Sequence, residues 1–216
     1  MNKILRNIVS AFFPERCPYC GDVVNAGKPA CPKCGAHFPN TIREGHAIGG
    51  YPYTAPFAYN GIFAEAVKRF KFNGHKEYAE KLAWQITNAV KESFSDAKFD
   101  CITCVPMHKN QLKNRGYNQS ELLAKNIAKQ LNIPYETLLV KHKENQPQHS
   151  LTSSQKRDNV RGVYKAVNTD KIKGNNILVI DDILTTGHTL GECCRILSKA
   201  GGGKIYSAAL CAKIIR

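Results

Sequence analysis

The 216-residue sequence lacks any apolar stretch long enough to cross a membrane, and it shows no internal repeat and no low-complexity segment. These absences argue against a membrane-inserted protein and a repeat protein. Acidic residues are also scarce, since 17 Asp and Glu stand against 31 Lys and Arg, giving a formal net charge of +14. Such an excess favours a polyanionic partner: nucleic acid, a phosphorylated ligand or an acidic membrane surface. The apolar fraction of 43% and the length indicate an ordinary globular chain with one medium domain and a small one.

Residues 1–13 combine two basic side chains with apolar ones, a composition that suggests either a secretory signal peptide or a structural helix. Arg6 interrupts the apolar run, and no small-x-small cleavage site follows. The apolar residues instead recur at helical spacing: Ile4, Leu5, Ile8 and Phe12. We therefore predict a short amphipathic helix that packs on the body, and a cytoplasmic protein without membrane insertion.

The nine cysteines are an odd number, and four of them form two CPxCG knuckles. The four are Cys17, Cys20, Cys31 and Cys34. Two residues between cysteines let both thiolates of a pair reach one ion, and the glycine after each pair permits a tight turn. This spacing predicts a closed, structural four-thiolate Zn²⁺ site in a reducing compartment, against the alternatives of disulfides or chance. Such a ribbon either contacts nucleic acid or braces the protein.

The stretch 175–191, NNILVIDDILTTGHTLG, predicts a strand, an acid pair, a small-residue turn and a helix in that order. The continuous apolar run Ile177–Ile180 is typical of a parallel strand buried on both faces. Asp181 and Asp182 follow it, and ligands of open α/β sheets lie beyond the carboxyl ends of the strands. Two adjacent acids can accept from two vicinal sugar hydroxyls or bind Mg²⁺.

The turn after the acid pair offers the unpaired N–H groups of a helix N-terminus, which favour a phosphate. Thr185, Thr186 and Thr189 add hydroxyls, and Gly187 lets the backbone approach closely. The turn contains neither the P-loop lysine nor GxGxxG. A ribose 5-phosphate matches these donors and acceptors; the alternative is a plain strand-to-helix turn with exposed acids.

A second polar segment follows the strand predicted at 99–106, whose Cys101 and Cys104 point to opposite faces and are predicted core residues. Residues 111–120, QLKNRGYNQS, are polar and contain a glycine, which predicts a mobile lid, and the segment 107–120 places cations at the mouth of the site. These cations are Lys109, Lys113 and Arg115. Ser120 is the predicted N-cap of the next helix.

Two helical stripes, over 63–70 and 79–90, predict a helical hairpin after an aromatic strand at 51–59. Its basic edge is either a solvated face or a contact for nucleic acid or phosphate, and comprises Lys68, Arg69, Lys71, His75 and Lys76. The strand's aromatic residues either stack bases or pack the sheet: Tyr51, Tyr53, Phe57 and Tyr59.

The stretch 175–191 resembles the signature of type I phosphoribosyltransferases that binds phosphoribosyl pyrophosphate (PRPP). VPMHKNQLKNRGYNQ further resembles the signature of the ComF family, phosphoribosyltransferase-like proteins linked to DNA uptake in natural competence. The matching positions are Pro106, His108, Arg115, Gly116, Asn118 and Gln119, with Tyr117 replacing Phe; Leu112 or Lys113 stands where arginine is usual. A third family segment is matched by residues 146–151 and by Arg157, Asn159, Val160 and Gly162.

The resemblance implies an α/β type I phosphoribosyltransferase fold, a parallel-sheet, Rossmann-like core, over 46–216. An N-terminal helix and a four-cysteine zinc ribbon would precede it over 1–45. Asp181 and Asp182 would hold the ribose hydroxyls and any Mg²⁺. The 5-phosphate would be cradled by Thr185, Thr186, Gly187, His188 and Thr189. Met107, His108 and Lys109 would contact pyrophosphate. The catalytic candidates are Arg115, Asn118 and Gln119 in the lid, and His108 as a proton donor or a structural residue.

The sequence leaves three functions open, because no feature identifies an acceptor base. The first is an active phosphoribosyltransferase of nucleotide metabolism, and the second is a non-catalytic PRPP sensor. The third, which the resemblance favours, is a PRPP-binding protein that handles single-stranded DNA in competence with other competence proteins.

Overall fold

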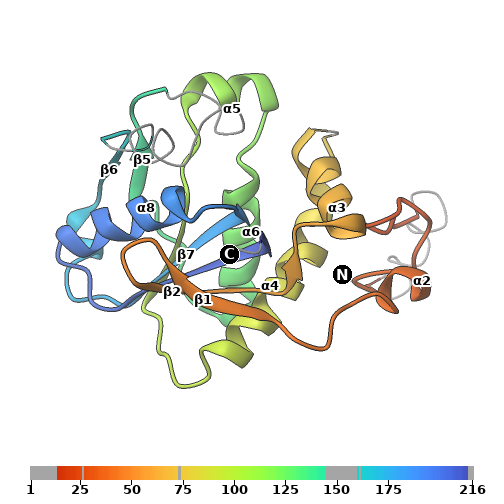
Figure 1. Cartoon of the computed structure of the whole chain (residues 1–216). Coiled ribbons are helices and arrows are strands. Elements are labelled where there is room, and N and C mark those ends of the chain that lie inside the picture. The colour runs from red at the N-terminus through yellow and green to blue at the C-terminus, as the bar shows by residue number, and fades with distance from the viewer. Residues whose placement is uncertain (1–13, 26, 73, 145–159, 161, 214–216) are drawn as a thin grey trace.

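The computed structural model describes residues 14–25, 27–72, 74–144, 160 and 162–213 (Figure 1). The predicted helix at 1–13 lies outside the described residues, as do residues 146–151, Arg157 and Asn159 of the third family segment. The N-terminal elements are α2 (Pro32–Gly35), β1 (Arg43–Ala47), β2 (Tyr51–Ala55), β3 (Phe57–Ala58), α3 (Gly61–Phe72), η1 (Lys76–Tyr78) and α4 (Ala79–Ser93). The remaining elements are β4 (Cys101–Cys104), α5 (Lys109–Arg115), α6 (Gln119–Leu131), β5 (Leu139–Lys141), β6 (Tyr164–Ala166), η3 (Thr169–Lys171), β7 (Ile177–Leu184), α8 (His188–Lys199) and β8 (Ile205–Ala212).

The central sheet is mostly parallel and has β7 in its interior. Its strand order is β1-β2-β8-β7-β4, with β3 also paired to β8. β7 pairs in parallel with β4 on one side and β8 on the other, so Ile177 lies between Cys101 and Ile205. Only the β1–β2 hairpin is antiparallel among the described strands of this sheet, while β5 and β6 form a separate antiparallel pair. The predicted α/β class is therefore confirmed.

Two hydrophobic clusters cover the two faces of the sheet, as expected for a strand buried on both sides. Leu178 and Ile180 of β7 pack in the cluster that contains α3, α4 and α6, whereas Ile177 and Val179 pack in the cluster that contains α8. Cys104 belongs to the first cluster and Cys101 to the second, which confirms their prediction as core residues on opposite faces.

The cysteine module lies at one end of the molecule, next to α3 (Figure 1). Tyr19 inserts from it into the body, where its ring contacts Phe57 and Phe63 edge-on, with centroids 6.0 and 5.8 Å away. Lys81 of α4 adds an ion pair to Glu15 at 3.0 Å. The module thus shares its hydrophobic core with the body.

Several local predictions need correction. The predicted lid is a helix over most of its length, because α5 occupies Lys109–Arg115 and ends at Gly116, whose φ of 81° is the left-handed conformation that glycine tolerates. The cap of α6 is Asn118, whose side chain accepts from Ser120 N at 3.1 Å, so Ser120 lies inside the helix.

Tyr53 and Phe57 are buried, so their rings pack against the sheet. None of the helices in the described ranges combines the length and apolar character needed to span a bilayer.

Candidate functional site

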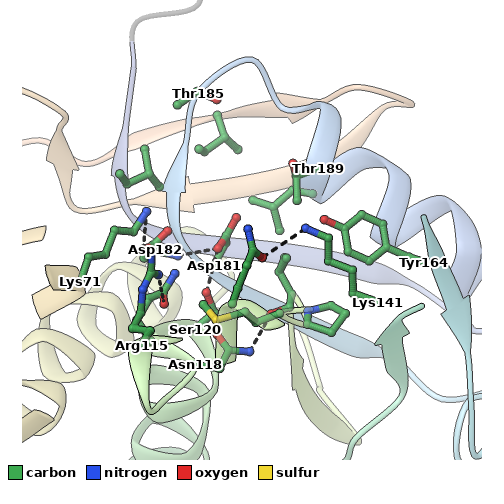
Figure 2. Close-up of a pocket in the computed structure, with 18 of the residues that line it drawn as sticks. Lys71, Arg115, Asn118, Ser120, Lys141, Tyr164, Asp181, Asp182, Thr185 and Thr189 are labelled. Atoms are coloured by element: carbon green, nitrogen blue, oxygen red, sulfur yellow. Dashed lines mark hydrogen bonds and ion pairs between the residues drawn. The ribbon is translucent and has the colours of Figure 1, made fainter. Parts of the chain in front are cut away.

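Asp181 and Asp182 lie inside β7, which continues to Leu184, and both side chains are buried (Figure 2). Ser120 Oγ of α6 donates to Asp181 Oδ1 at 2.8 Å, and the Asp182 N–H donates to the same oxygen at 2.9 Å. The Ser120 contact links the acid pair to a helix 61 residues earlier in the chain.

Lys71, at the end of α3, makes an ion pair with Asp182: Nζ and Oδ2 are 2.7 Å apart. This residue was predicted on a basic edge that is either solvated or in contact with nucleic acid or phosphate, and its side chain points into the site (Figure 2). The signal was present in the sequence, because Lys71 follows the buried Val67 by four residues and so borders the apolar stripe of α3. Other members of that edge also have partners, since Lys68 pairs with Glu65 and Arg69 donates to the Tyr19 carbonyl.

Burial raises the pKa of Asp181 to about 7, and the neighbouring charge of Asp182 acts in the same direction. Lys71 and the Ser120 hydrogen bond oppose this rise in pKa. Asp181 therefore changes its protonation near neutral pH, and any ligand that donates hydrogen bonds or positive charge to it favours the ionised form.

The turn after β7 is shaped to receive an anion. Gly187 has φ 75° and precedes α8, whose N-terminal cap makes no side-chain hydrogen bond within the described part of the chain. A Cβ at Gly187 would lie 3.4 Å from the Ile48 nitrogen in the β1–β2 turn, so the hairpin supports this loop from behind. Thr186 Oγ1 is buried and has no hydrogen-bond partner among the described residues. The 12-residue helix α8 therefore directs the positive end of its dipole at a turn that offers a further hydroxyl.

A cavity of about 310 Å³ joins these parts. The predicted site residues that line it are Met107, Arg115, Asn118, Gln119, Asp181, Asp182, Thr185, Gly187 and Thr189. It is also lined by Lys71 of the basic edge, and by four residues to which no ligand contact was assigned: Gln111, Ser120, Lys141 and Tyr164. Lys141 and Tyr164 come from the β5–β6 pair, which no motif marks as part of the site.

Two further cations of the cavity wall, Arg115 and Lys141, are held by their neighbours. Arg115 Nη1 donates to Gln119 Oε1 at 2.7 Å, and its guanidinium lies over the Phe72 ring at 5.1 Å. Lys141 Nζ donates to Gln111 Oε1 at 3.4 Å, and burial lowers the pKa of this lysine. Both cations face a volume that suits a phosphorylated group.

Four of the predicted residues do not line the cavity as the described residues shape it: His108, Lys109, Thr186 and His188. His108 caps α5 by accepting from Asn110 N at 3.4 Å, and its Nδ1 lies 3.8 Å from Glu144 Oε1. Asn118, which does line the cavity, caps α6 and donates to the Val105 carbonyl at 3.1 Å. The geometry thus gives His108 a structural contact.

The four module cysteines converge, since their Sγ atoms all lie within 4.8 Å of one another. Sγ of Cys20 and Sγ of Cys31 are 3.6 Å apart, close to the roughly 3.8 Å expected between sulfurs of a tetrahedral Zn–S₄ centre. Burial raises the pKa of the Cys20 thiol to about 11, and a bound cation would favour its thiolate form. The cluster can hold one metal ion.

Gly21 has φ 87° as a tight turn requires, whereas Gly35 has no positive φ, so the second knuckle does not depend on its glycine.

The fold and cavity agree with the comparison to known protein families. Residues 118–216 match the phosphoribosyl transferase domain, and this match contains both β7 and the acid pair. The part of the chain from α6 to β8 therefore has a phosphoribosyl transferase domain.

Its relatives define the family more narrowly. Competence protein F of Haemophilus influenzae is 26% identical over 214 residues, covering 88% of this chain and 93% of that protein. DNA utilization protein YhgH of Salmonella typhi is 26% identical, covering 90% and 83%. Competence protein ComFC of Bacillus subtilis is 28% identical over 145 residues, covering 67% and 57%. These relatives, the phosphoribosyl transferase match and the four-cysteine cluster all support the resemblance of this chain to ComF-type proteins.

Proposed function

We propose that this ComF-type protein binds PRPP or ribose 5-phosphate in the 310 Å³ cavity and acts, in the cytoplasm, in the handling or uptake of single-stranded DNA during competence. The observation that carries the proposal is the juxtaposition of a buried acid pair, a helix N-terminus without a side-chain cap and two cations around one cavity. The names of the relatives support the role in competence.

Each part of a ribose phosphate has a chemical counterpart in the cavity. Asp181 and Asp182 accept from the two ring hydroxyls, and the turn from Thr185 to Thr189 donates to the 5-phosphate. We assign pyrophosphate to the Met107 backbone, with Arg115 and Lys141 as the facing cations. His108 and Lys109 contribute by fixing the start of α5.

Two metals belong to this proposal. Zinc is the metal that the four-thiolate cluster suits best, with a structural role because no coordination position is left open. Mg²⁺ is expected with PRPP, where it neutralises the pyrophosphate oxygens. The protein's own contribution to phosphoribosyl transfer is to orient the ribose, to stabilise the departing negative charge and to exclude water.

Binding is tested by calorimetry with ribose 5-phosphate and with PRPP plus Mg²⁺, using the full chain with its zinc. We expect saturable binding that Asp182→Asn weakens at least about 100-fold, because a buried charged hydrogen-bond acceptor is lost. Absence of binding of either ligand to the folded wild-type protein would contradict the proposal. Pyrophosphate release with a panel of nucleobases then separates an active transferase from a PRPP sensor, which binds without release.

The DNA function is tested separately. Lys109 and Lys113 are exposed on α5, which borders the cavity, and, unlike Lys68 and Lys71, no ion pair to either is seen in the described structure. Charge reversal at both is expected to weaken binding of a single-stranded oligonucleotide and to flatten its salt dependence, while Asp181→Asn leaves binding intact. Salt-independent binding, or none, would contradict a DNA-handling role. Repeating the titration with PRPP shows whether the two ligands are coupled.

A further inference from the structure

The ion pair between Lys71 and Asp182 occupies the place where the acid pair meets its ligand. Nζ of Lys71 lies 2.7 Å from Asp182 Oδ2, and the side chains are 19% and 4% exposed. Both residues line the cavity, and Figure 2 shows the lysine reaching the carboxylate from the helix α3 side. The contact therefore belongs to the cavity wall as well as to the packing of α3 on the sheet.

A divalent cation does not fit at this oxygen while Lys71 is in place. Mg²⁺ takes oxygen ligands and repels an ammonium group, so the two cations compete for Asp182 Oδ2. Asp181 Oδ1 is already engaged by the Ser120 hydroxyl and by the Asp182 N–H. The acid pair thus offers Mg²⁺ fewer free oxygens than its sequence suggests.

Lys71 supplies the charge compensation that a metal ion would otherwise provide. When both buried carboxylates are ionised they carry a charge of −2, and the Lys71 ammonium, whose Nζ lies 2.7 Å from Asp182 Oδ2, reduces it to −1. Sugar hydroxyls can donate to the remaining carboxylate oxygens without displacing the lysine, because the ammonium uses only Oδ2 of Asp182.

We infer that the Lys71 ammonium replaces a divalent cation at Asp182, so that the acid pair accepts the diol of a sugar phosphate without Mg²⁺. This inference rests on the proposed sugar-phosphate site. Lys71 is a positioning residue because it acts through Asp182. Mg²⁺ that arrives on the pyrophosphate of PRPP is unaffected, since that group lies toward Arg115 and Lys141 in the proposed orientation.

The chain provides a matched control on the same helix. Lys68, three residues earlier, pairs with Glu65 at the same distance of 2.7 Å, but both side chains are more than half exposed. Lys68→Gln makes the same chemical change outside the cavity. Lys71→Gln removes the ammonium from the site, and Lys71→Arg retains a cation there.

The experiment is a calorimetric titration with ribose 5-phosphate in buffer depleted of divalent ions by resin and in buffer with millimolar Mg²⁺. A soluble chelator is avoided because it would remove the metal of the cysteine module. For wild type, Lys68→Gln and Lys71→Arg, we expect dissociation constants that agree within about twofold between the two buffers. For Lys71→Gln we expect binding about tenfold weaker without Mg²⁺, and recovery of most of the loss when Mg²⁺ is added.

A merely structural role for Lys71 predicts a loss of affinity that Mg²⁺ does not restore, and this result would overturn the inference. A second measurement is binding of Mn²⁺ alone, followed by electron paramagnetic resonance, which should be about tenfold tighter in Lys71→Gln than in wild type. Equal Mn²⁺ affinity overturns the inference. If the glutamine variant does not fold, the wild type decides: Mg²⁺-independent binding supports the inference, and an absolute requirement for Mg²⁺ overturns it.

The failure of this inference is distinguishable from failure of the proposed function. If the wild-type protein binds neither ribose 5-phosphate nor PRPP in either buffer, the proposed function and the inference about Lys71 are both wrong. If the wild-type protein binds ribose 5-phosphate only in the presence of Mg²⁺, the proposed site is supported and the inference about Lys71 is wrong.

Discussion

The cysteine module and the cavity at β7 are the two proposed binding centres of the molecule, and they are assembled differently. The four thiols of the module come from 18 consecutive residues, Cys17 to Cys34, and their Sγ atoms meet through two short turns. The cavity combines β7 with Lys71 of α3, Ser120 of α6 and Lys141 of β5, so its walls come from segments far apart in the chain. The spacing of the cysteines along the chain is sufficient to bring the four thiols together, whereas the cavity forms only when distant elements of the domain pack against one another.

The largest effect is expected in the module, if a metal ion supplies its folding energy. Structural zinc contributes about 10 kcal/mol or more of binding free energy, so Cys31→Ser should unfold the module. We expect one zinc per wild-type chain by elemental analysis, none in the variant, and new protease cleavage between residues 14 and 38. Because Tyr19 packs on Phe57 and Phe63, the melting temperature of the body should fall as well.

Cys101→Ala is the matched control, because it removes a buried thiol that lies in β4. It should retain one zinc. Wild-type protein without zinc, or zinc retained in Cys31→Ser, would show that the module does not fold on a metal.

The next largest effect is expected on the free energy of unfolding, when the two ion pairs made by α3 are compared. Lys71–Asp182 is buried, and removing Asp182 leaves an uncompensated ammonium, so Asp182→Asn should cost about 3 kcal/mol of unfolding free energy. In a double-mutant cycle with Lys71→Met, measured by urea denaturation, the combined cost should be clearly smaller than the sum. The exposed Lys68–Glu65 pair, with the same 2.7 Å distance, should show no measurable coupling. Equal coupling in the two cycles would mean that burial does not set their strength.

A smaller effect on stability is expected when two glycines are each replaced by alanine. A Cβ at Gly191 would lie 2.3 Å from the Ile48 carbonyl oxygen, so Gly191→Ala must separate α8 from the β1–β2 turn at a cost of about 2 kcal/mol. A Cβ at Gly35 of the module would meet no atom of a non-neighbouring residue within 4 Å, and the φ of Gly35 is not positive. Gly35→Ala should therefore leave stability nearly unchanged. Thermal denaturation of both variants tests this contrast, and a larger loss for Gly35→Ala would reverse it.

The smallest expected effect is a dependence on pH. The folded pKa of Asp181, about 7, lies above its ordinary value near 4, so the folded state holds the proton that the unfolded state has lost. Stability is therefore expected to fall as pH rises from about 4 to 7, and then to level off. Asp181→Asn removes this contribution and should be more stable than wild type at pH 8 but not at pH 4. The groups that face Asp181 are Asp182, Lys71 and Ser120. Parallel curves for the two proteins from pH 4 to 8, measured by urea denaturation without Mg²⁺, would contradict the raised pKa.

The sequence predicted the structure correctly where all residues of a pattern lie in one short segment. The uninterrupted apolar run Ile177–Ile180 predicted a strand buried on both faces, and β7 lies between β4 and β8. Alternation within β4 placed Cys101 and Cys104 on opposite faces. The two CPxCG knuckles predicted a four-thiol cluster because the chain between paired cysteines is too short to separate them.

The sequence was misleading where polar residues were interpreted without their tertiary partners. Residues 111–120 are mostly polar and suggested a mobile lid, yet residues 111–115 belong to α5, which His108 caps, and residues 119 and 120 begin α6. Lys71 was grouped with a basic edge whose role was left open, because charge alone does not show which side of a helix end meets the sheet. Ser120 was predicted to cap α6, but Asn118 caps it and leaves the Ser120 hydroxyl for Asp181.

The sequence by itself determined the strand, the acid pair, the threonine turn and the metal cluster, since their geometry follows from neighbouring residues. Only the tertiary structure decided that a lysine from α3 neutralises Asp182, that α6 orients Asp181, and that β5 and β6 close the cavity with Lys141 and Tyr164. The physical reason is that the charge balance of a buried carboxylate depends on groups within a few ångströms in space, and the packing of distant elements selects those groups.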